Sequence, residues 1–258
     1  MHLPDGFLSV PVSGAMILAS AGGVAAALAR AEVSRGVSDA VEPVGPTEAE
    51  ASVGAGGEAG RGLVMMGVLA AFVFVAQMLN IPISGGTSGH LLGAALVTAL
   101  VGPWRGILVM CVVVLLQALI FADGGLLVLG ANVFNMGIVG CLLSGLILDL
   151  AGAEPRRRRW ALALAAWLSV EAGAGLAAMQ LGFSGLLPTR VAVPAMLGVH
   201  AVIGLLEAAI TVAAYSLLVE ARPDLAAAGV RTPVSYLNCN DRFIQSNIST
   251  LVISSTQL

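Results

Sequence analysis

Long apolar runs, separated by shorter polar connections, are the feature that most restricts how this chain can fold. Of its 258 residues only 10% are charged and 58% are apolar, whereas a soluble domain carries about 25% charged residues. Most of the chain therefore cannot face water, and the sequence predicts an all-α, polytopic integral membrane protein. Its 32 glycines suit close helix contacts in lipid, because small residues let two backbones approach.

Seven apolar stretches can be delimited, and five of them reach the length of about 17–25 residues that is normal for a spanning helix. Gly106–Ala122 lies at the lower edge of that range. The thirteen residues of Gly89–Val101 would cover only about 20 Å as a helix, which fits a re-entrant piece or a short span buried in protein. The seven are Val10–Ala29, Leu63–Leu79, Gly89–Val101, Gly106–Ala122, Val133–Leu150, Trp160–Leu181 and Val193–Val219.

The arginine distribution decides whether the short stretch spans. Cytoplasmic loops collect Lys and Arg, which places the run Arg156–Arg159 inside. If all seven stretches span, only Arg190 before the last stretch falls outside, and five further arginines lie inside: Arg30, Arg35, Arg61, Arg105 and Arg222. We therefore expect about seven transmembrane helices, an N-terminal helix plus a six-helix body, with the N-terminus outside and the C-terminus inside.

The chain divides into a membrane part and a tail. We expect residues 1–222 to form one membrane-embedded domain, with a flexible cytoplasmic loop at residues 31–62, which are rich in Gly, Glu, Ala and Ser. No Ala occurs after Ala228, in a chain otherwise crowded with Ala. Residues 223–258 are therefore atypical, and we expect them to be disordered.

Composition excludes several kinds of chemistry. All twelve basic residues are Arg, so the chain lacks both the P-loop lysine and a Schiff-base lysine. If ATP drives this protein, another subunit must bind it. The formal net charge of −3 gives no indication of nucleic-acid binding. Cys111, Cys141 and Cys239 form no CxxC motif, so a structural zinc site is not expected.

The predicted topology gathers all three histidines, His2, His90 and His200, at the outer face. No signal-peptide features precede the first helix, so we expect Met1 to remain as the mature end. The α-amine of Met1 and the amide and imidazole nitrogens of His2 can then close adjacent chelate rings on one metal. Nitrogens in a plane favour Ni(II) or Cu(II), and His90 could supply the fourth. The alternative is that His2 is an ordinary solvated terminal residue.

Further polar residues lie near this face or inside the spans. Ser88 belongs to a glycine-rich irregular stretch before His90, where such a backbone is tolerated if it lines a cavity. Asn132 and Asn135 could hydrogen-bond ligand side chains and fix their tautomers, or act as helix caps. Glu171 and Glu207 lie within spans, and Glu207 shares a helix face with His200, so these three residues form a possible intramembrane network.

Four ordered blocks together resemble the CbiM/NikM family, the substrate-capture components of cobalt and nickel energy-coupling-factor transporters. The likeness covers roughly residues 1–222, and the tail beyond Arg231 departs from it. The blocks run from Met1 to Leu8, from Gly86 to Gly93, from Asp123 to Gly137, and from His200 to Glu207.

The resemblance implies a multi-pass protein of the bacterial plasma membrane that captures Ni(II) or Co(II) as transported substrate, with no organic cofactor. The metal would be held by the amine of Met1, the amide and imidazole nitrogens of His2, and His90. The implied partners are a transmembrane coupling subunit, ATPase subunits and often a small accessory membrane protein. Sequence does not choose between nickel and cobalt.

The sequence also allows two other classes of function. An intramembrane serine protease would pair Ser88 with His200 as a dyad, provided that the serine hydroxyl reaches the imidazole. This alternative leaves His2 and His90 unexplained. A channel is disfavoured because the chain has no continuous polar helix face.

Overall fold

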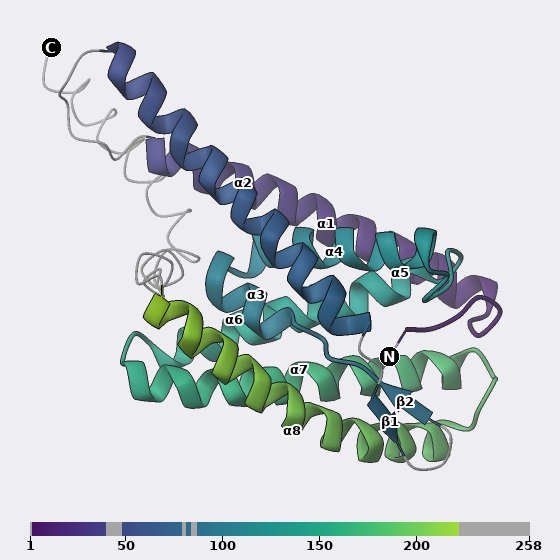
Figure 1. The fold of residues 1–258 in the computed structure, drawn as a ribbon. Helices are drawn as coiled ribbons and strands as arrows, with labels where there is room; N and C mark the ends of the chain where they lie inside the picture. The colour runs from purple at the N-terminus through teal and green to yellow at the C-terminus, as the bar shows by residue number, and fades with distance from the viewer. Residues whose placement is uncertain (1, 40–47, 79–80, 84–86, 222–258) are drawn as a thin grey trace, which may run out of the picture.

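The computed structural model describes residues 2–39, 48–78, 81–83 and 87–221, and it is a helical bundle with one short hairpin (Figure 1). The α-helices are α1 Val10–Asp39, α2 Glu48–Met78, α3 Ala94–Val101, α4 Pro103–Ile120, α5 Leu129–Asn132, α6 Gly140–Ala151, α7 Pro155–Phe183 and α8 Thr189–Ala221. A π-helix, η1 Val133–Val139, joins α5 to α6. The antiparallel strands are β1 Ile81–Ile83 and β2 Thr87–Gly89.

Within the described residues, five helical segments are long and apolar enough to cross a membrane, and a sixth, Gly62–Met78 in α2, is shorter. The prediction of an all-α, multi-pass membrane protein is confirmed. The continuous segment α5–η1–α6 counts as one of these crossings, because the π-helix changes the winding without breaking the rod. The five are Val10–Ala31, Pro103–Ile120, Leu129–Ala151, Pro155–Phe183 and Thr189–Ala221.

The short apolar stretch forms α3, a helix of 8 residues in which Ala94–Leu100 are all buried. His90, just before it, stacks on His2 at one end of the bundle. Just after α3, the guanidinium carbon of Arg30 lies 4.3 Å from the ring centroid of Trp104, near the other end of α1. The chain from His90 to Trp104 therefore passes through the depth of the bundle, as the protein-buried interpretation predicted.

The stretch 31–62, predicted to be a flexible loop, is mostly helical. α1 continues to Asp39 and α2 already begins at Glu48. Once a helix has been nucleated, each further residue adds a hydrogen bond, and the Ala, Glu and Arg of this stretch favour helix. Residues 40–47 and the predicted tail 223–258 lie outside the described residues.

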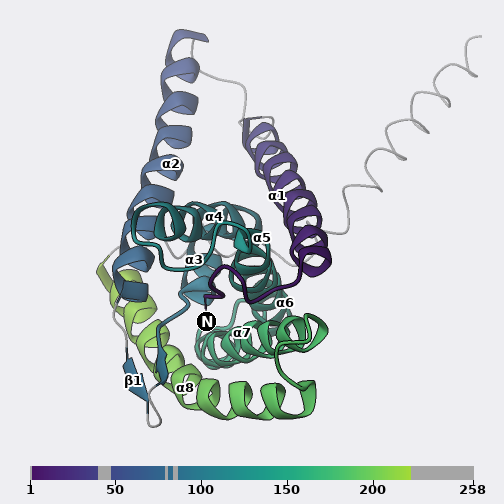
Figure 2. The same ribbon diagram turned by 90° about the vertical axis from the view of Figure 1, so that its right-hand side faces the viewer.

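α1 is a peripheral helix that touches the body along a narrow line. Only 11% of its apolar window is buried, against 56% for the α5–α6 span, and α1 lies beside α5 and away from α8 (Figure 2). A Cβ on Gly130 would lie 2.6 Å from the Ile17 Cα, so glycine permits this contact. Ser20 Oγ also donates to the Gly130 carbonyl at 2.5 Å. These contacts agree with the expectation that α1 is an added helix on a larger helical body.

Candidate metal centre

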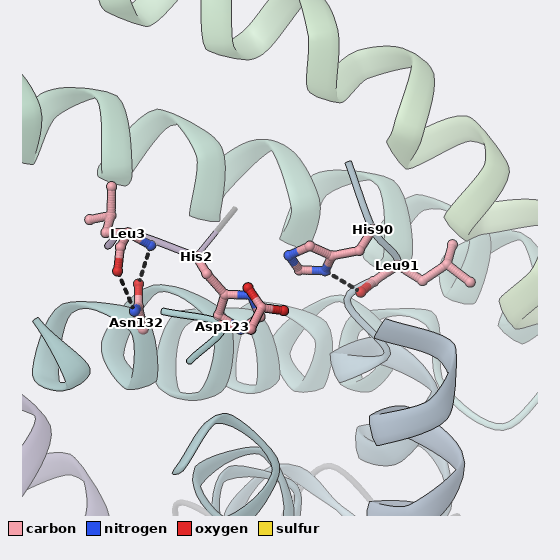
Figure 3. Close-up of polar contacts among 6 residues, drawn as sticks. All are labelled: His2, Leu3, His90, Leu91, Asp123 and Asn132. Carbon is pink, nitrogen blue, oxygen red and sulfur yellow. Dashed lines mark hydrogen bonds and ion pairs between the residues drawn. The ribbon is translucent and has the colours of Figure 1, made fainter. Parts of the chain in front are cut away.

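The N-terminal segment enters the end of the bundle and is held there through its main chain. The Leu3 N–H donates to Asn132 Oδ1 at 2.8 Å, and Asn132 Nδ2 donates to the Leu3 carbonyl at 3.1 Å (Figure 3). The same carbonyl accepts the Gly125 N–H at 2.9 Å. Asn132 is only 1% exposed. Leu3, which follows His2, is therefore fixed by the side-chain amide of Asn132, 129 residues further along the chain.

Asp5 attaches the same segment to the loop between α4 and α5. Its carboxylate accepts the N–H groups of Leu127 at 2.8 Å and Leu126 at 3.2 Å. A Cβ on Gly125 would collide with Asp5, so this close approach requires glycine. Further along, the Ser9 N–H donates to Ser184 Oγ at 3.0 Å. Residues 2–9 are thus tied to two different connections between helices.

His2 lies under the turn that carries Asp123. Its side chain is 3% exposed, and its Nδ1 is 3.3 Å from Asp123 Oδ1. This contact with His2 is the main cause that lowers the pKa of Asp123 below its usual value, and the nearby imidazoles reinforce the effect. Gly124 follows in a left-handed turn conformation, with a φ of 91°. A Cβ on Gly124 would lie 3.4 Å from the His2 Cδ2.

His90 is buried and has a defined tautomer. Its Nδ1 lies 2.9 Å from the Leu91 carbonyl, which can only accept, so Nδ1 carries the proton and Nε2 the lone pair. Burial is the main cause that lowers the pKa of His90 well below its ordinary value, and the neighbouring His2 adds to this. At neutral pH the ring is therefore neutral, the form that can bind a metal.

The structure brings His2 and His90 together. Their ring centroids are 4.7 Å apart and the ring planes are inclined by 22°. Imidazole lone pairs lie in the ring plane, and a metal–nitrogen bond is about 2.0–2.1 Å long. One ion cannot lie in two stacked planes at once, so at least one ring must turn before both bind the same ion. Met1 lies outside the described residues.

Side chains alone do not supply a complete ligand set here. Within the described ranges, no three His, Cys, Asp or Glu side chains are grouped so that they could hold a metal ion. The predicted set draws two of its nitrogens from the main chain and α-amine of residues 1 and 2, and such groups do not count in a side-chain cluster. The ligand assignment therefore stays a prediction.

The polar residues predicted around the ligands take other partners. Asn132 binds the Leu3 main chain, as described above. Asn135, in the π-helix, exchanges two hydrogen bonds with Gln180, at 2.9 and 2.8 Å. Ser88 belongs to β2, but its side chain lies outside the described residues. Both asparagines thus position backbone and helices, and neither is found on an imidazole nitrogen in the described part of the chain.

His200, Glu171 and Glu207 do not form the network that their placement suggested. His200 Nδ1 lies 2.8 Å from the Met196 carbonyl one turn earlier. Glu207 instead accepts the N–H groups of Leu92 and Gly93. Among the described residues, no hydrogen bond joins these three side chains to one another.

Two residues at this end were not assigned a role from sequence. Asp123 contacts His2, and its only sequence signal is its position before two glycines in an outer loop. Gln77 donates to the Leu92 carbonyl at 2.6 Å, and nothing in the pattern of α2 marks it. Each side chain contacts a residue elsewhere in the sequence, and the periodic pattern of apolar residues does not reveal such contacts.

Comparison with known proteins gives consistent matches along the chain. The family model for CbiM, the cobalt uptake substrate-specific transmembrane region, matches residues 2–225. A relative from Haloquadratum walsbyi, whose name refers to metal transport, is 37% identical over 227 residues, covering 87% of this chain and 93% of its own. The fused nickel transport protein NikMN of Rhodobacter capsulatus is 35% identical over 186 residues, covering 65% of this chain and 54% of its own.

Solved structures agree with these sequence relatives. A crystal structure described as a truncated transition metal transporter superposes with a TM-score of 0.67 at 28% identity. The match covers 86% of this chain and 99% of that one. This chain thus resembles that transporter both in the arrangement of its helices and in its amino-acid sequence.

Proposed function

Because the chain belongs to the CbiM family of cobalt uptake transmembrane regions, we propose that it is the substrate-binding membrane component of an energy-coupling-factor transporter that imports Ni(II), Co(II) or both. The cobalt and nickel transport names of its relatives support this substrate class. The bacterial plasma membrane is the corresponding location. Metal enters as cargo, and the chain itself performs no covalent chemistry.

The observation that carries the proposal is the meeting of His2 and His90, with ring centroids 4.7 Å apart, on a main chain fixed at Leu3. We assign the metal to the amine of Met1, the amide nitrogen and Nδ1 of His2, and Nε2 of His90. Only Nδ1 closes a small chelate ring with the amide nitrogen of its own residue. Metal binding therefore requires His2 to leave Asp123. A planar set of nitrogens favours nickel over cobalt.

The remaining parts of the transporter belong to other subunits in this proposal. A transmembrane coupling subunit, ATPase subunits and a small accessory membrane subunit complete it. Relatives in which nickel transport parts are fused into one chain agree with an assembly of several components. Since this chain has no lysine for a P-loop, the purified chain should not hydrolyse ATP. ATPase activity of this chain alone would contradict that division.

The decisive experiment adds one residue before Met1. The extension moves the amine one peptide unit from the imidazole and so changes the chelate rings, while His2 remains. We expect Ni(II) affinity, measured by calorimetry on purified protein, to fall by more than the roughly 10–100-fold that follows loss of a supporting residue. His2→Ala and His90→Ala should be comparably damaging. One residue added at the C-terminus is the matched control.

Ser88→Ala separates this proposal from the protease alternative. A hydroxyl that at most supports the ligands should cost no more than about 10–100-fold in affinity. A Ser88–His200 protease predicts the reverse order, with Ser88→Ala fatal to activity and the N-terminal extension harmless. If the extended protein binds Ni(II) and Co(II) as tightly as the unmodified protein, the amine is not a ligand and the assignment is wrong.

A further inference from the structure

A buried carboxylate in α8 holds the segment that follows His90. Glu207 is 2% exposed, and its two oxygens accept the N–H groups of two consecutive residues. Oε2 accepts from Leu92 at 2.9 Å, and Oε1 accepts from Gly93 at 2.7 Å. The bonds link positions 115 and 114 residues apart in sequence. Glu207 thus ties α8 to the start of α3.

The same short segment is held from the opposite side by α2. Gln77, 1% exposed, donates from Nε2 to the Leu92 carbonyl at 2.6 Å. Leu92 itself is fully buried. Both main-chain groups of Leu92 are therefore bound by side chains, one from α8 and one from α2. Such a residue cannot shift along either direction without breaking a buried hydrogen bond.

This anchored segment leads directly to His90. The His90 Nδ1 is bound to the Leu91 carbonyl, so the orientation of its ring depends on the peptide that Leu92 continues. On the other side, Gly93 has a φ of 81°, and a Cβ there would lie 2.8 Å from a Val73 methyl carbon. The backbone from His90 to α3 consequently has one well-defined path, fixed by contacts with α2 and α8.

A buried acidic side chain at position 207 destabilises the helix bundle unless polar groups bind it. Ionisable groups inside membrane spans are expensive and usually serve a function or meet a partner. Helix packing alone would be served by an apolar residue. A glutamate side chain offers two oxygen acceptors, one for each of the two neighbouring N–H groups. In Glu207→Gln, the side-chain NH₂ group would face one of the two N–H donors and could not accept a hydrogen bond from it.

We propose that Glu207 is a positioning residue for metal capture, which holds Leu92 and Gly93 so that His90 presents Nε2 to the ion beside His2. This inference rests on the proposed function, in which His90 is a ligand. Glu207 does not touch the metal. It acts through the main chain, and Gln77 supports it from α2.

The test compares Glu207→Gln with His90→Ala and with Trp167→Phe as a matched control. Trp167 donates from Nε1 to the Ala201 carbonyl at 3.1 Å, so its replacement also removes one hydrogen bond to α8, but one that does not involve the segment from His90 to Gly93. Three quantities are measured on purified protein: Ni(II) affinity, the visible absorption band of bound Ni(II), and the melting temperature without metal. The band reports the nitrogens around the ion, which a purely structural role would leave unchanged.

We expect Glu207→Gln to weaken Ni(II) binding by about 10–100-fold and to move the band toward that of His90→Ala. Trp167→Phe should leave affinity and band unchanged. If His90→Ala weakens binding but Glu207→Gln keeps both the native affinity and the native band, the positioning role is refuted and the proposed function stands. If His90→Ala itself binds normally, the proposed function fails.

A second variant covers the case in which Glu207→Gln does not fold. Gln77→Leu removes the other anchor of Leu92 and leaves the charge of Glu207 in place. The positioning role predicts the same change in affinity and band, in the same direction, for Gln77→Leu. A folded Gln77→Leu protein with native affinity and band would overturn the inference.

Discussion

The two ends of the helix bundle are held together in different ways. At the end that carries His2, side chains bind main-chain groups far away in sequence, as Asn132 binds Leu3 across 129 residues and Glu207 binds Leu92 across 115. At the other end, Glu154 accepts the N–H groups of Arg156 and Arg157 in its own helix, 2 and 3 residues on. The first end is fixed by hydrogen bonds between distant residues, whereas the second combines this local helix cap with the contact of Arg30 on Trp104.

The proposed metal site gives a reason for this difference between the two ends. In the proposed site, the α-amine and the amide nitrogen belong to the backbone, so side-chain rotamers cannot position them. Long-range hydrogen bonds to the neighbouring peptides are a direct way to hold such groups. The arginine-rich end only has to join helices and meet the aqueous phase, for which helix caps and exposed charges suffice.

Accessibility should give the sharpest contrast between the ends. In a background without the native cysteines, a cysteine at position 5 should react with a membrane-impermeant reagent added outside the cell, and one at position 35 should not. The reason is the predicted orientation, with the N-terminus outside and the arginines inside. Labelling of position 35 in intact cells, or protection of position 5, would overturn the orientation.

Asn132→Leu should produce the next largest effect. It leaves the buried Leu3 N–H without its acceptor, at a cost of about 1–3 kcal/mol, while the Leu3 carbonyl keeps the Gly125 N–H as a donor. Thermal unfolding in detergent measures this loss. Because the segment that carries His2 is no longer held, Ni(II) affinity should also fall by about 10–100-fold.

The matched control is Ser144→Ala in the same continuous helical segment. Ser144 is fully buried and donates at 2.7 Å to the Gly140 carbonyl one turn earlier, so only a local bond is lost. Its stability should change little and its Ni(II) affinity not at all. Equal losses of affinity in both variants would mean that long-range anchoring is not what distinguishes the metal end.

Asp5→Asn should have a smaller effect at the same end. The asparagine oxygen can still accept from one of the N–H groups of Leu126 and Leu127, but its NH₂ group faces the second N–H and cannot accept from it. These hydrogen bonds are exposed, and such bonds contribute about 0.5–1 kcal/mol. Ni(II) affinity should fall by roughly 2–5-fold. A loss as large as that of Asn132→Leu would show that Asp5 is a main anchor.

Glu154→Ala, at the opposite end, should change least. Hydrogen bonds from the Arg157 and Arg156 N–H groups hold the pKa of Glu154 below its ordinary value. The folded state thus prefers the carboxylate, and the cap acts fully above the ordinary pKa and is lost as pH falls through the lowered one. At neutral pH we expect a slightly lower melting temperature and unchanged Ni(II) affinity. A weaker affinity would contradict the separation of the ends.

Sequence reasoning went far where one pattern covers many residues. Apolar length and the arginine count gave the spans, and counting them placed His2 and His90 at one end, where their rings are stacked. It did not foresee what Glu207 binds. A shared helix face suggested His200, but the partners are the N–H groups of Leu92 and Gly93. Backbone groups are the same at every position, so sequence carries no mark of which ones a side chain will reach.

The ends of elements show the same limit. The apolar pattern of the third stretch begins at Gly89, yet α3 begins only at Ala94, because the residues between them form part of β2 and the anchored segment. The π-helix at Val133–Val139 was not predicted either. A single added residue per turn leaves apolar periodicity almost unchanged over so short a span.

The stacked pair of His2 and His90 has a consequence for the rate of metal uptake. In the proposed site, the stacked form cannot accept an ion with both rings, so only the fraction of molecules with a turned ring is competent at any instant. The apparent dissociation constant is then the intrinsic one divided by that fraction. Observed association should level off at high metal concentration, where ring turning becomes the slow step. A variant that keeps the rings apart would bind faster and more tightly.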